Sequence, residues 1–177
     1  SCPHGVIRPY LAKPEDLSNK PESLVGKNAT GKEFAGHQYF LQISPLDCTG
    51  CGVCVDVCPT KQKSLVMKNL EEVVEEEIVK FEYLETLTEH EVQYDPSTLK
   101  NSQFKKPLFD IKEPVVDVEK TFIKLATQLF GDRMLIANAT GCTSIYGGSA
   151  PSCPYTTNKD GHGPAWANSL FEDNAEF

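Results

Sequence analysis

Four cysteines within residues 46–59, LDCTGCGVCVDVCP, form the feature of the chain best suited to carry chemistry. The set follows the pattern C-x2-C-x2-C-x3-C-P and consists of Cys48, Cys51, Cys54 and Cys58. Three thiolates at three-residue intervals can each bind a different iron of one [4Fe–4S] cube. Structural zinc sites instead use two C-x2-C pairs far apart in sequence, so the spacing favours an iron–sulfur cluster over zinc.

The same loop carries further residues that suit a cluster. Gly50 and Gly52 leave room for backbone N–H groups to approach inorganic sulfides, and Pro59 turns the chain away. When one domain holds two such clusters, the fourth cysteine of each run ligates the other cluster. We therefore expect Cys58 to serve a second cluster, whose remaining ligands lie outside this run.

The fourth ligand of the first cluster is predicted at the N-terminus. A Cys-Pro pair at residues 2–3 is followed by a small and then aliphatic stretch, as at the end of a cluster run. Cys2 would then complete the set begun by the first three loop cysteines, and the other run would begin before residue 1. The alternative is that Cys2 is a chance exposed thiol.

Composition narrows the class of protein. The chain has 177 residues and a net charge of −8, which argues against nucleic acid or an anionic membrane surface as a partner. It has no apolar run of the roughly 18 residues that a transmembrane helix needs. Seven cysteines, with four in one loop, indicate a reducing compartment, by default the cytoplasm. The start resembles no signal peptide and lacks Met, and we expect both ends to be cut.

The middle of the chain changes in character after the cysteine loop. Residues 61–67, KQKSLVM, suit a short strand, and residues 95–107 have the composition of a linker. Between them apolar residues recur at helical spacing, with a Glu-rich remainder that predicts a solvated face. These apolar residues are Leu70, Val74, Ile78, Phe81 and Leu84.

A second unit is predicted from Glu119 onward. Its first element is a helix that Gly131 ends, with Phe122, Leu125, Ala126, Leu129 and Phe130 on one face. MLIAN follows as a short buried strand, and Trp166, after a proline at a predicted helix start, is expected in the core. A helix, a strand and then a Gly-rich loop are typical of α/β folds.

Ligands of α/β sheets bind beyond the carboxyl ends of strands, and Cys142 stands at such a place. Thr140 and Gly141 flank it in the loop ATGCTSIYGGSAPSCP. The spacing alone favours a plainer interpretation, because a lone cysteine commonly behaves as a small buried hydrophobic residue.

Three stretches resemble pyruvate:ferredoxin oxidoreductase, in the order in which that family has them. Residues 129–177, which begin LFGDRMLIANATGC, resemble its thiamine-diphosphate domain. SPLDCTGCGVCVDVCP resembles the second cluster run of its ferredoxin-like domain, and CPHGVIRPYL resembles the end of the first run. The resemblance covers nearly the whole chain.

The resemblance implies an α+β ferredoxin-like cluster domain followed by the beginning of an α/β thiamine-diphosphate-binding domain. We expect the [4Fe–4S] domain, truncated at its N-terminus, over residues 1–68 and an acidic helix and linker over 69–107. The N-terminal part of the thiamine-diphosphate domain is expected over 108–177.

The family's activity implies oxidative decarboxylation of pyruvate with coenzyme A to acetyl-CoA and CO2. Electrons would leave through [4Fe–4S] clusters to ferredoxin or flavodoxin, and the full-length enzyme, a homodimer, would hold thiamine diphosphate and Mg2+. Cys142 would ligate the thiamine-proximal cluster, with Thr140 and Gly141 at the cofactor. A related 2-oxoacid oxidoreductase and a stand-alone ferredoxin-type carrier are the alternatives, and an anaerobic eukaryote would place the enzyme in a hydrogenosome.

One segment departs from the family. Where the family has G-A-C-x-G-C-G-E, with two further cluster ligands, residues 112–121 read KEPVVDVEKT. A one-base shift of a possible coding sequence for residues 112–120 restores the family motif, so a reading-frame slip is our hypothesis and a true variant is the alternative. Without those cysteines, Cys142 lacks partners, and this chain alone is expected to be inactive toward pyruvate.

Overall fold

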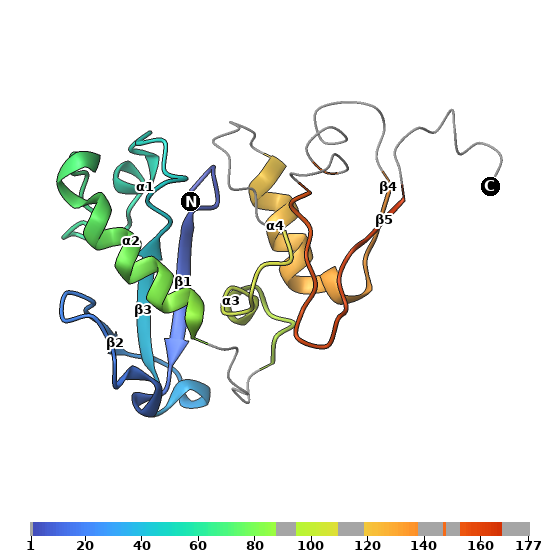
Figure 1. Cartoon of the computed structure of the whole chain (residues 1–177), viewed down its shortest axis with the longest axis horizontal. Coiled ribbons are helices and arrows are strands. Elements are labelled where there is room, and N and C mark those ends of the chain that lie inside the picture. Colours follow the sequence, from blue (N-terminus) through green and yellow to red (C-terminus); the bar gives the residue numbers. More distant parts are fainter. Residues whose placement is uncertain (1, 88–94, 110–118, 138–146, 148–152, 168–177) are drawn as a thin grey trace.

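The computed structural model describes residues 2–87, 95–109, 119–137, 147 and 153–167 (Figure 1). The strands are β1 (Ile7–Ala12), β2 (Lys27–Asn28), β3 (Gln38–Ile43), β4 (Leu135–Ala137) and β5 (Ala165–Ala167). The α-helices are α1 (Val53–Asp56), α2 (Leu70–Thr86), α3 (Leu99–Ser102) and α4 (Glu119–Phe130). Short 3-10 helices span Pro14–Leu17, Lys32–Phe34 and Gly131–Arg133. None of the described helices is long and apolar enough to cross a membrane.

An antiparallel sheet in the order β1-β3-β2 organises the N-terminal half. β1 pairs with β3 along its whole length, from Ile7 opposite Ile43 to Ala12 opposite Gln38. A hydrogen bond from Ser44 N to the Val6 carbonyl, at 3.0 Å, extends this ladder by one step. The pairing therefore brings the chain before β1 and the chain after β3 to the same end of the sheet.

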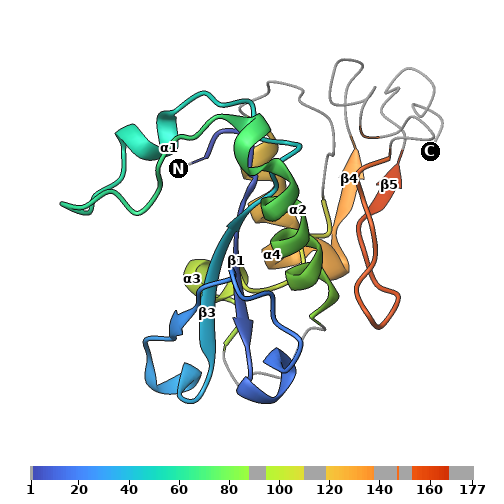
Figure 2. The ribbon, with the colours of Figure 1, turned by 60° about the vertical axis from the view of Figure 1, so that its left-hand side comes forward.

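The long helix α2 covers one face of this sheet (Figure 2). Leu84 is fully buried, and it packs with Ala12, Leu24 and Phe40 in the core. Full burial of a leucine or phenylalanine contributes about 1.5–3 kcal/mol. The helix predicted from apolar spacing is confirmed, although Leu70, at its first turn, is 48% exposed.

The strand predicted over residues 61–67 is wrong, because this stretch has no strand partner. Its polar groups bond within the loop instead. Lys63 Nζ donates to the carbonyls of Asp56 and Cys58, at 3.1 and 3.4 Å. The backbone N–H of Ser64 points to Cys58 Sγ at 3.4 Å. The stretch therefore folds back onto the cysteine loop.

The stretch predicted as a linker, 95–107, contains the short helix α3. The Thr98 side chain caps this helix by accepting a hydrogen bond from Asn101 N at 3.3 Å. Asn101 and Ser102 are buried, and α3 contacts α4. Gln128 on α4 donates to the carbonyl of Lys105 at 3.2 Å. The stretch is thus packed between the two halves of the chain.

Helix α4 is confirmed, but its apolar face is not its most buried side. Phe122 and Phe130 are 68% and 50% exposed, whereas Lys120, Thr127 and Gln128 are buried. The polar side of the helix makes the contacts because its neighbours, the N-terminal turn and the 103–108 stretch, present backbone carbonyls as hydrogen-bond acceptors. Apolar spacing identifies the stripe but not which element lies against it.

The strand predicted in MLIAN is present as β4, and it pairs in parallel with β5. Parallel pairing agrees with the α/β pattern of the sequence. The expected burial is wrong, since Leu135 is 83% exposed. Trp166 lies in β5 and not at a helix start. Most of the Gly-rich loop that follows β4, residues 138–146 and 148–152, is outside the described residues.

Candidate iron–sulfur site

The cysteines that precede β1 and follow β3 meet at one hollow. Cys2 lies five residues before β1, and Cys48 lies five residues after β3. Because β1 and β3 pair in register, these two segments emerge side by side. Four thiols line the hollow, and they belong to Cys2, Cys48, Cys51 and Cys54.

The hollow is otherwise largely apolar. The apolar side chains that line it include Val6, Ile7, Ile43 and Met67. Its volume of about 20 Å³ holds about one water molecule, so a cluster requires the exposed loop with Cys48 and Cys51 to move outward. None of the six described cysteines forms a disulfide. Reduced thiols in an apolar surround suit thiolate ligation of iron.

The spacing of these thiols bears on the choice between zinc and a cluster. Four thiolates around one zinc at about 2.3 Å each lie only about 4 Å apart. Among the described residues, no group of three His, Cys, Asp or Glu side chains is placed to hold a single metal ion. Ligands of a [4Fe–4S] cube bind four separate irons and stand farther apart. The described cysteines therefore do not form a single-ion site in this structure, and the preference for a cube over zinc rests on their spacing in the sequence.

The pKa of Cys54 reflects both its burial and the other thiols near it. Its pKa is raised, first by burial and then by the neighbouring Cys2 and Cys48. Thiolates this near to one another repel, and that repulsion disfavours the charged form unless cationic iron lies among them. The electrostatics of the hollow thus favour a cationic occupant.

Two glycines give the loop its shape. Gly50 and Gly52 have φ of 68° and 76°, the left-handed region that other residues avoid. A Cβ at either position would meet no atom within 4 Å, so backbone conformation and not space selects glycine. Gly52 also caps α1, where its carbonyl accepts from Val55 N at 2.9 Å. The glycines thereby set how the chain passes from Cys51 into the helix that carries Cys54.

Cys58 differs from the other loop cysteines. It is absent from the lining of the hollow in the part of the chain that the structure describes. The backbone N–H of Ser64 and the Thr60 hydroxyl and N–H lower the pKa of Cys58 to about 6. Its thiolate therefore predominates at neutral pH, as in a metal-ligating or reactive cysteine.

Helix α4 holds the turn that carries Cys2. This turn closes with a hydrogen bond from Gly5 N to the Cys2 carbonyl at 3.2 Å. Thr121 Oγ1 lies 3.1 Å from the Cys2 carbonyl and 3.0 Å from that of Pro3. Lys124 Nζ donates to the Gly5 carbonyl at 2.6 Å. Spacing gave no signal for Thr121 and Lys124, because these contacts join positions more than a hundred residues apart.

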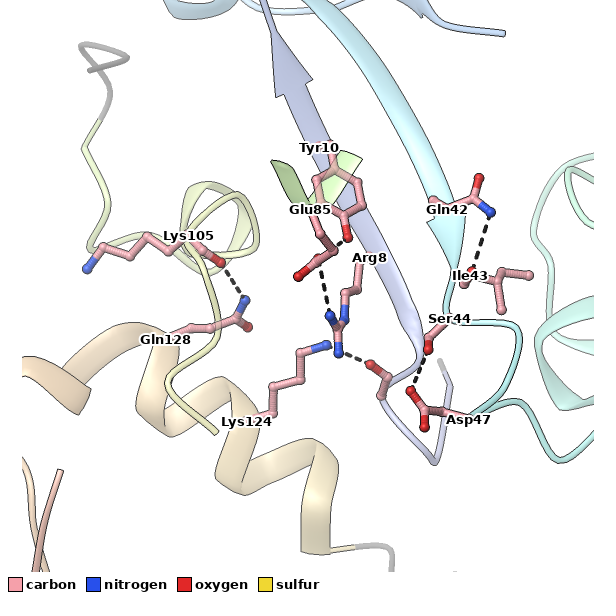
Figure 3. Close-up of polar contacts among 11 residues, drawn as sticks. Arg8, Tyr10, Gln42, Ile43, Ser44, Asp47, Glu85, Lys105, Lys124 and Gln128 are labelled. Carbon is pink, nitrogen blue, oxygen red and sulfur yellow. Dashed lines mark hydrogen bonds and ion pairs between the residues drawn. The ribbon is translucent and has the colours of Figure 1, made fainter. Parts of the chain in front are cut away.

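Polar contacts also fix the strands below the hollow (Figure 3). Arg8 Nη1 donates to Glu85 Oε1 at 3.2 Å, and its guanidinium lies 5.2 Å from the centre of the Phe81 ring. The Tyr10 hydroxyl donates to the same carboxylate. Burial, and then the bond to Glu85, raise the pKa of Tyr10. After β3, Ser44 donates to the carboxylate of Asp47 at the start of the cysteine loop.

The predicted thiamine-side residues Thr140, Gly141 and Cys142 lie outside the described residues. Cys153, to which the sequence assigned no role, is exposed, and its thiol points to the Gly147 carbonyl at 3.4 Å. The turn from Asn158 to Gly161 forms around the Asn158 side chain, which accepts from Asp160 N and His162 N.

Comparison with known proteins agrees with this geometry. The 4Fe-4S binding domain family matches residues 41–62. The chain is 59% identical over 177 residues to pyruvate:ferredoxin oxidoreductase of Moorella thermoacetica, covering 99% of the chain and 15% of that protein. It is 54% identical over 177 residues to pyruvate-flavodoxin oxidoreductase of Enterobacter agglomerans, with the same coverage. It is homologous to one segment of these oxidoreductases.

A third relative extends the comparison to a eukaryote. Pyruvate dehydrogenase [NADP(+)] of Cryptosporidium parvum is 47% identical over 178 residues, covering 99% of the chain and 9% of that protein. The chain thus spans about 15% or less of the length of these curated relatives. The resemblance found in the sequence is confirmed, and the matched 4Fe-4S segment contains Cys48 to Cys58 but not Cys2.

Proposed function

We propose that the chain is the electron-transfer segment of a pyruvate:ferredoxin or pyruvate:flavodoxin oxidoreductase. The observation that carries the proposal is the meeting of Cys2 with three cysteines of the loop at one hollow. The homology over 99% of the chain supports the same conclusion. The whole enzyme would oxidise pyruvate with coenzyme A to acetyl-CoA and CO2, and it would pass electrons to ferredoxin or flavodoxin.

In this proposal the four thiols of the hollow hold one [4Fe–4S] cluster, and Cys58 ligates a second. A bound cluster supplies one-electron acceptance and donation. The protein's own groups position the thiols: Gly50 and Gly52 shape the loop, and α4 holds the turn of Cys2. The apolar side chains around the hollow limit the access of water.

The remaining assignments extend to the second unit. We propose the domain boundaries 1–68, 69–107 and 108–177, with the last range beginning a thiamine-diphosphate domain. Cys142 would ligate the cluster nearest thiamine, and Thr140 and Gly141 would lie at that cofactor, which Mg2+ anchors in the full-length homodimer. A cytoplasmic location fits this chemistry.

Anaerobic reconstitution with iron and sulfide tests the cluster. We expect about four irons per chain at this site and an electron paramagnetic resonance signal on reduction. Cys2→Ala should lower the iron content and alter the signal, because it removes a ligand. Cys153→Ala is the matched control, since this exposed cysteine lies in the second unit. Equal iron content and spectra in both variants would contradict the ligand set.

The substrate is tested on the longest available form of the protein. Turnover with pyruvate should depend on coenzyme A and reduce ferredoxin or flavodoxin. A clear preference for another 2-oxoacid would instead assign the chain to a related oxidoreductase and leave the cluster site as proposed.

A further inference from the structure

Ser44 lies between the two arms of the chain that carry Cys2 and Cys48. The Cys2 arm enters β1, and the Cys48 arm leaves β3. The backbone N–H of Ser44 donates to the Val6 carbonyl on the Cys2 arm at 3.0 Å. Its hydroxyl donates to the carboxylate of Asp47 on the Cys48 arm (Figure 3). One residue therefore makes hydrogen bonds to both arms.

These two bonds lie next to the wall of the hollow. Ser44 is 3% exposed, and its partner Val6 and its chain neighbour Ile43 both line the hollow. Burial excludes most of the water that would compete for the hydroxyl. A hydrogen bond to a charged group is also stronger than one between neutral groups. The bond from Ser44 to Asp47 is therefore suited to fix the start of the Cys48 arm.

The segment Ser-Pro-Leu-Asp, which begins at Ser44, favours a turn. Serine is common at the first position of a β-turn, and proline at the second position has the φ that the turn requires. Pro45 is buried and Leu46 is 69% exposed, so the chain passes from the sheet to the surface at this turn. Asp47, the last residue of the turn, directly precedes Cys48. Its bond to the serine hydroxyl thus closes the turn one residue before the first cysteine of the loop.

The residues that directly follow Asp47 make weaker contacts. Cys48 and Cys51 are exposed. Thr49 Oγ1 lies 3.5 Å from both ring nitrogens of His4, which is the outer limit of a hydrogen bond. The loop can therefore move outward to admit a cluster while Asp47 stays bound. The bond to Asp47 then sets the point from which the loop moves.

We propose that Ser44 is a positioning residue of the iron–sulfur site and that it acts through Asp47. Its two hydrogen bonds fix the start of the Cys48 arm relative to the Cys2 arm. The thiols from the two arms thereby keep the spacing that one cluster requires. This role rests on the proposed function, since it requires a cluster in the hollow, but neither Ser44 nor Asp47 is a ligand.

Hydrogen exchange of the metal-free chain tests this bond in the absence of a cluster. In Asp47→Ala the amide of Ser44, at the end of the ladder, should exchange about tenfold faster. The reason is that a hydrogen bond to a charged group, worth about a tenfold change in an equilibrium, no longer holds that residue. Amides in the middle of β1 and β3 should exchange as before. Asp95→Ala is the matched control, because it removes a carboxylate that Ser97 binds at 2.6 Å outside the lining of the hollow.

Iron release from the reconstituted chain tests the positioning of the ligands. Ser44→Ala and Asp47→Ala should each release iron to a chelator about tenfold faster than the unchanged chain. Each should also alter the electron paramagnetic resonance spectrum of the reduced cluster. The double variant should be no worse than either single variant, because both changes remove the same bond. Ser44→Thr keeps a hydroxyl and should restore slow release and the original spectrum, and Ser97→Ala is the matched control.

Three results would overturn the proposal. The first is exchange of the Ser44 amide at the same rate in Asp47→Ala and Asp95→Ala. The second is iron release and a spectrum in Ser44→Ala that match those of Ser97→Ala. The third is a double variant whose two effects add, which would mean that the side chains act separately. A chain that takes up no cluster would instead contradict the proposed function, and the exchange of the Ser44 amide would still decide whether the bond holds the arm.

Discussion

Replacing Lys124 by methionine tests whether α4 positions Cys2, the proposed cluster ligand. Methionine keeps an unbranched side chain but removes the ammonium that donates to the Gly5 carbonyl at 2.6 Å. Hydrogen bonds from charged groups contribute about 1.5–3 kcal/mol, and Lys124 is half-buried, which favours the lower end. A loss of about 1.4 kcal/mol is a tenfold change in an equilibrium. Opening of the Cys2 turn should therefore become about tenfold more frequent.

Two measurements, both made without oxygen, detect the opening of the Cys2 turn. Iron release from the reconstituted cluster to a chelator should accelerate about tenfold, because loss of the Cys2 ligand exposes the cluster. Hydrogen exchange should accelerate in the backbone amides of residues 4–6, while the paired amides of β1 and β3 exchange as before. This local pattern separates positioning from a general loss of stability.

Lys27→Met is the control for Lys124→Met. Lys27 is exposed in the short strand β2 and is not part of the lining of the hollow. If Lys124→Met releases iron and exchanges amides at the rates of this control, then α4 does not hold the turn. If both variants release iron and exchange these amides faster to the same extent, the effect does not come from the Lys124 hydrogen bond, and the reasoning is also refuted.

Four further substitutions probe the loop and the sheet. Cys58→Ala should leave the iron held by the hollow in place, whereas Cys51→Ala should remove it, as iron analysis would show. Gly52→Ala should destabilise the folded chain by about 1 kcal/mol in urea unfolding, because its φ is 76°. Tyr10 has a raised pKa in the fold, so its contribution is present below the unfolded pKa of about 10 and is lost as pH rises above it. Tyr10→Phe should thus show a smaller loss of stability than the unchanged chain above pH 10, and an equal loss would contradict this assignment.

The sequence predicted the features that depend on local spacing. The cysteine pattern, the helix from Leu70 and the turn at Asn158 each follow from residues close in sequence. The helix from Glu119 also formed as predicted, but its apolar stripe includes Phe122, which is 68% exposed. Local spacing defines an element and its faces, whereas the choice of the buried face depends on the neighbour it meets.

The features that the sequence missed depend on pairing between distant segments. Strands β1 and β3 carry no clean alternation of polar and apolar residues, and Pro9 within β1 weakens a strand prediction. Yet their register brings Cys2 to the loop of Cys48. A cavity lined by Arg8, Gln103, Gln128 and Lys159 likewise gathers its residues from β1, the 103–107 stretch, α4 and the turn at residue 159.

Segment 112–121, which departs from the family motif, affects some of these tests and leaves others unchanged. Residues 112–118 lie outside the described part of the chain, but Lys120 is buried on α4 and Thr121 contacts the Cys2 carbonyl. If a reading-frame slip produced this segment, both of those residues would differ in the native protein. Lys124 lies beyond the segment, so the test of the Cys2 turn does not depend on the slip.

Sequencing the DNA across codons 109–124 decides between the slip and a true variant. A missing or extra base that restores two cysteines before α4 would give Cys142 its partners. The two restored cysteines would then precede α4 and belong to the cluster proposed for Cys142. Through Lys124, α4 also holds the turn of Cys2, which is the proposed ligand of a different cluster. Codons that stand as given would leave α4 with only the Cys2 side of this arrangement, and electron transfer from thiamine could not pass through Cys142.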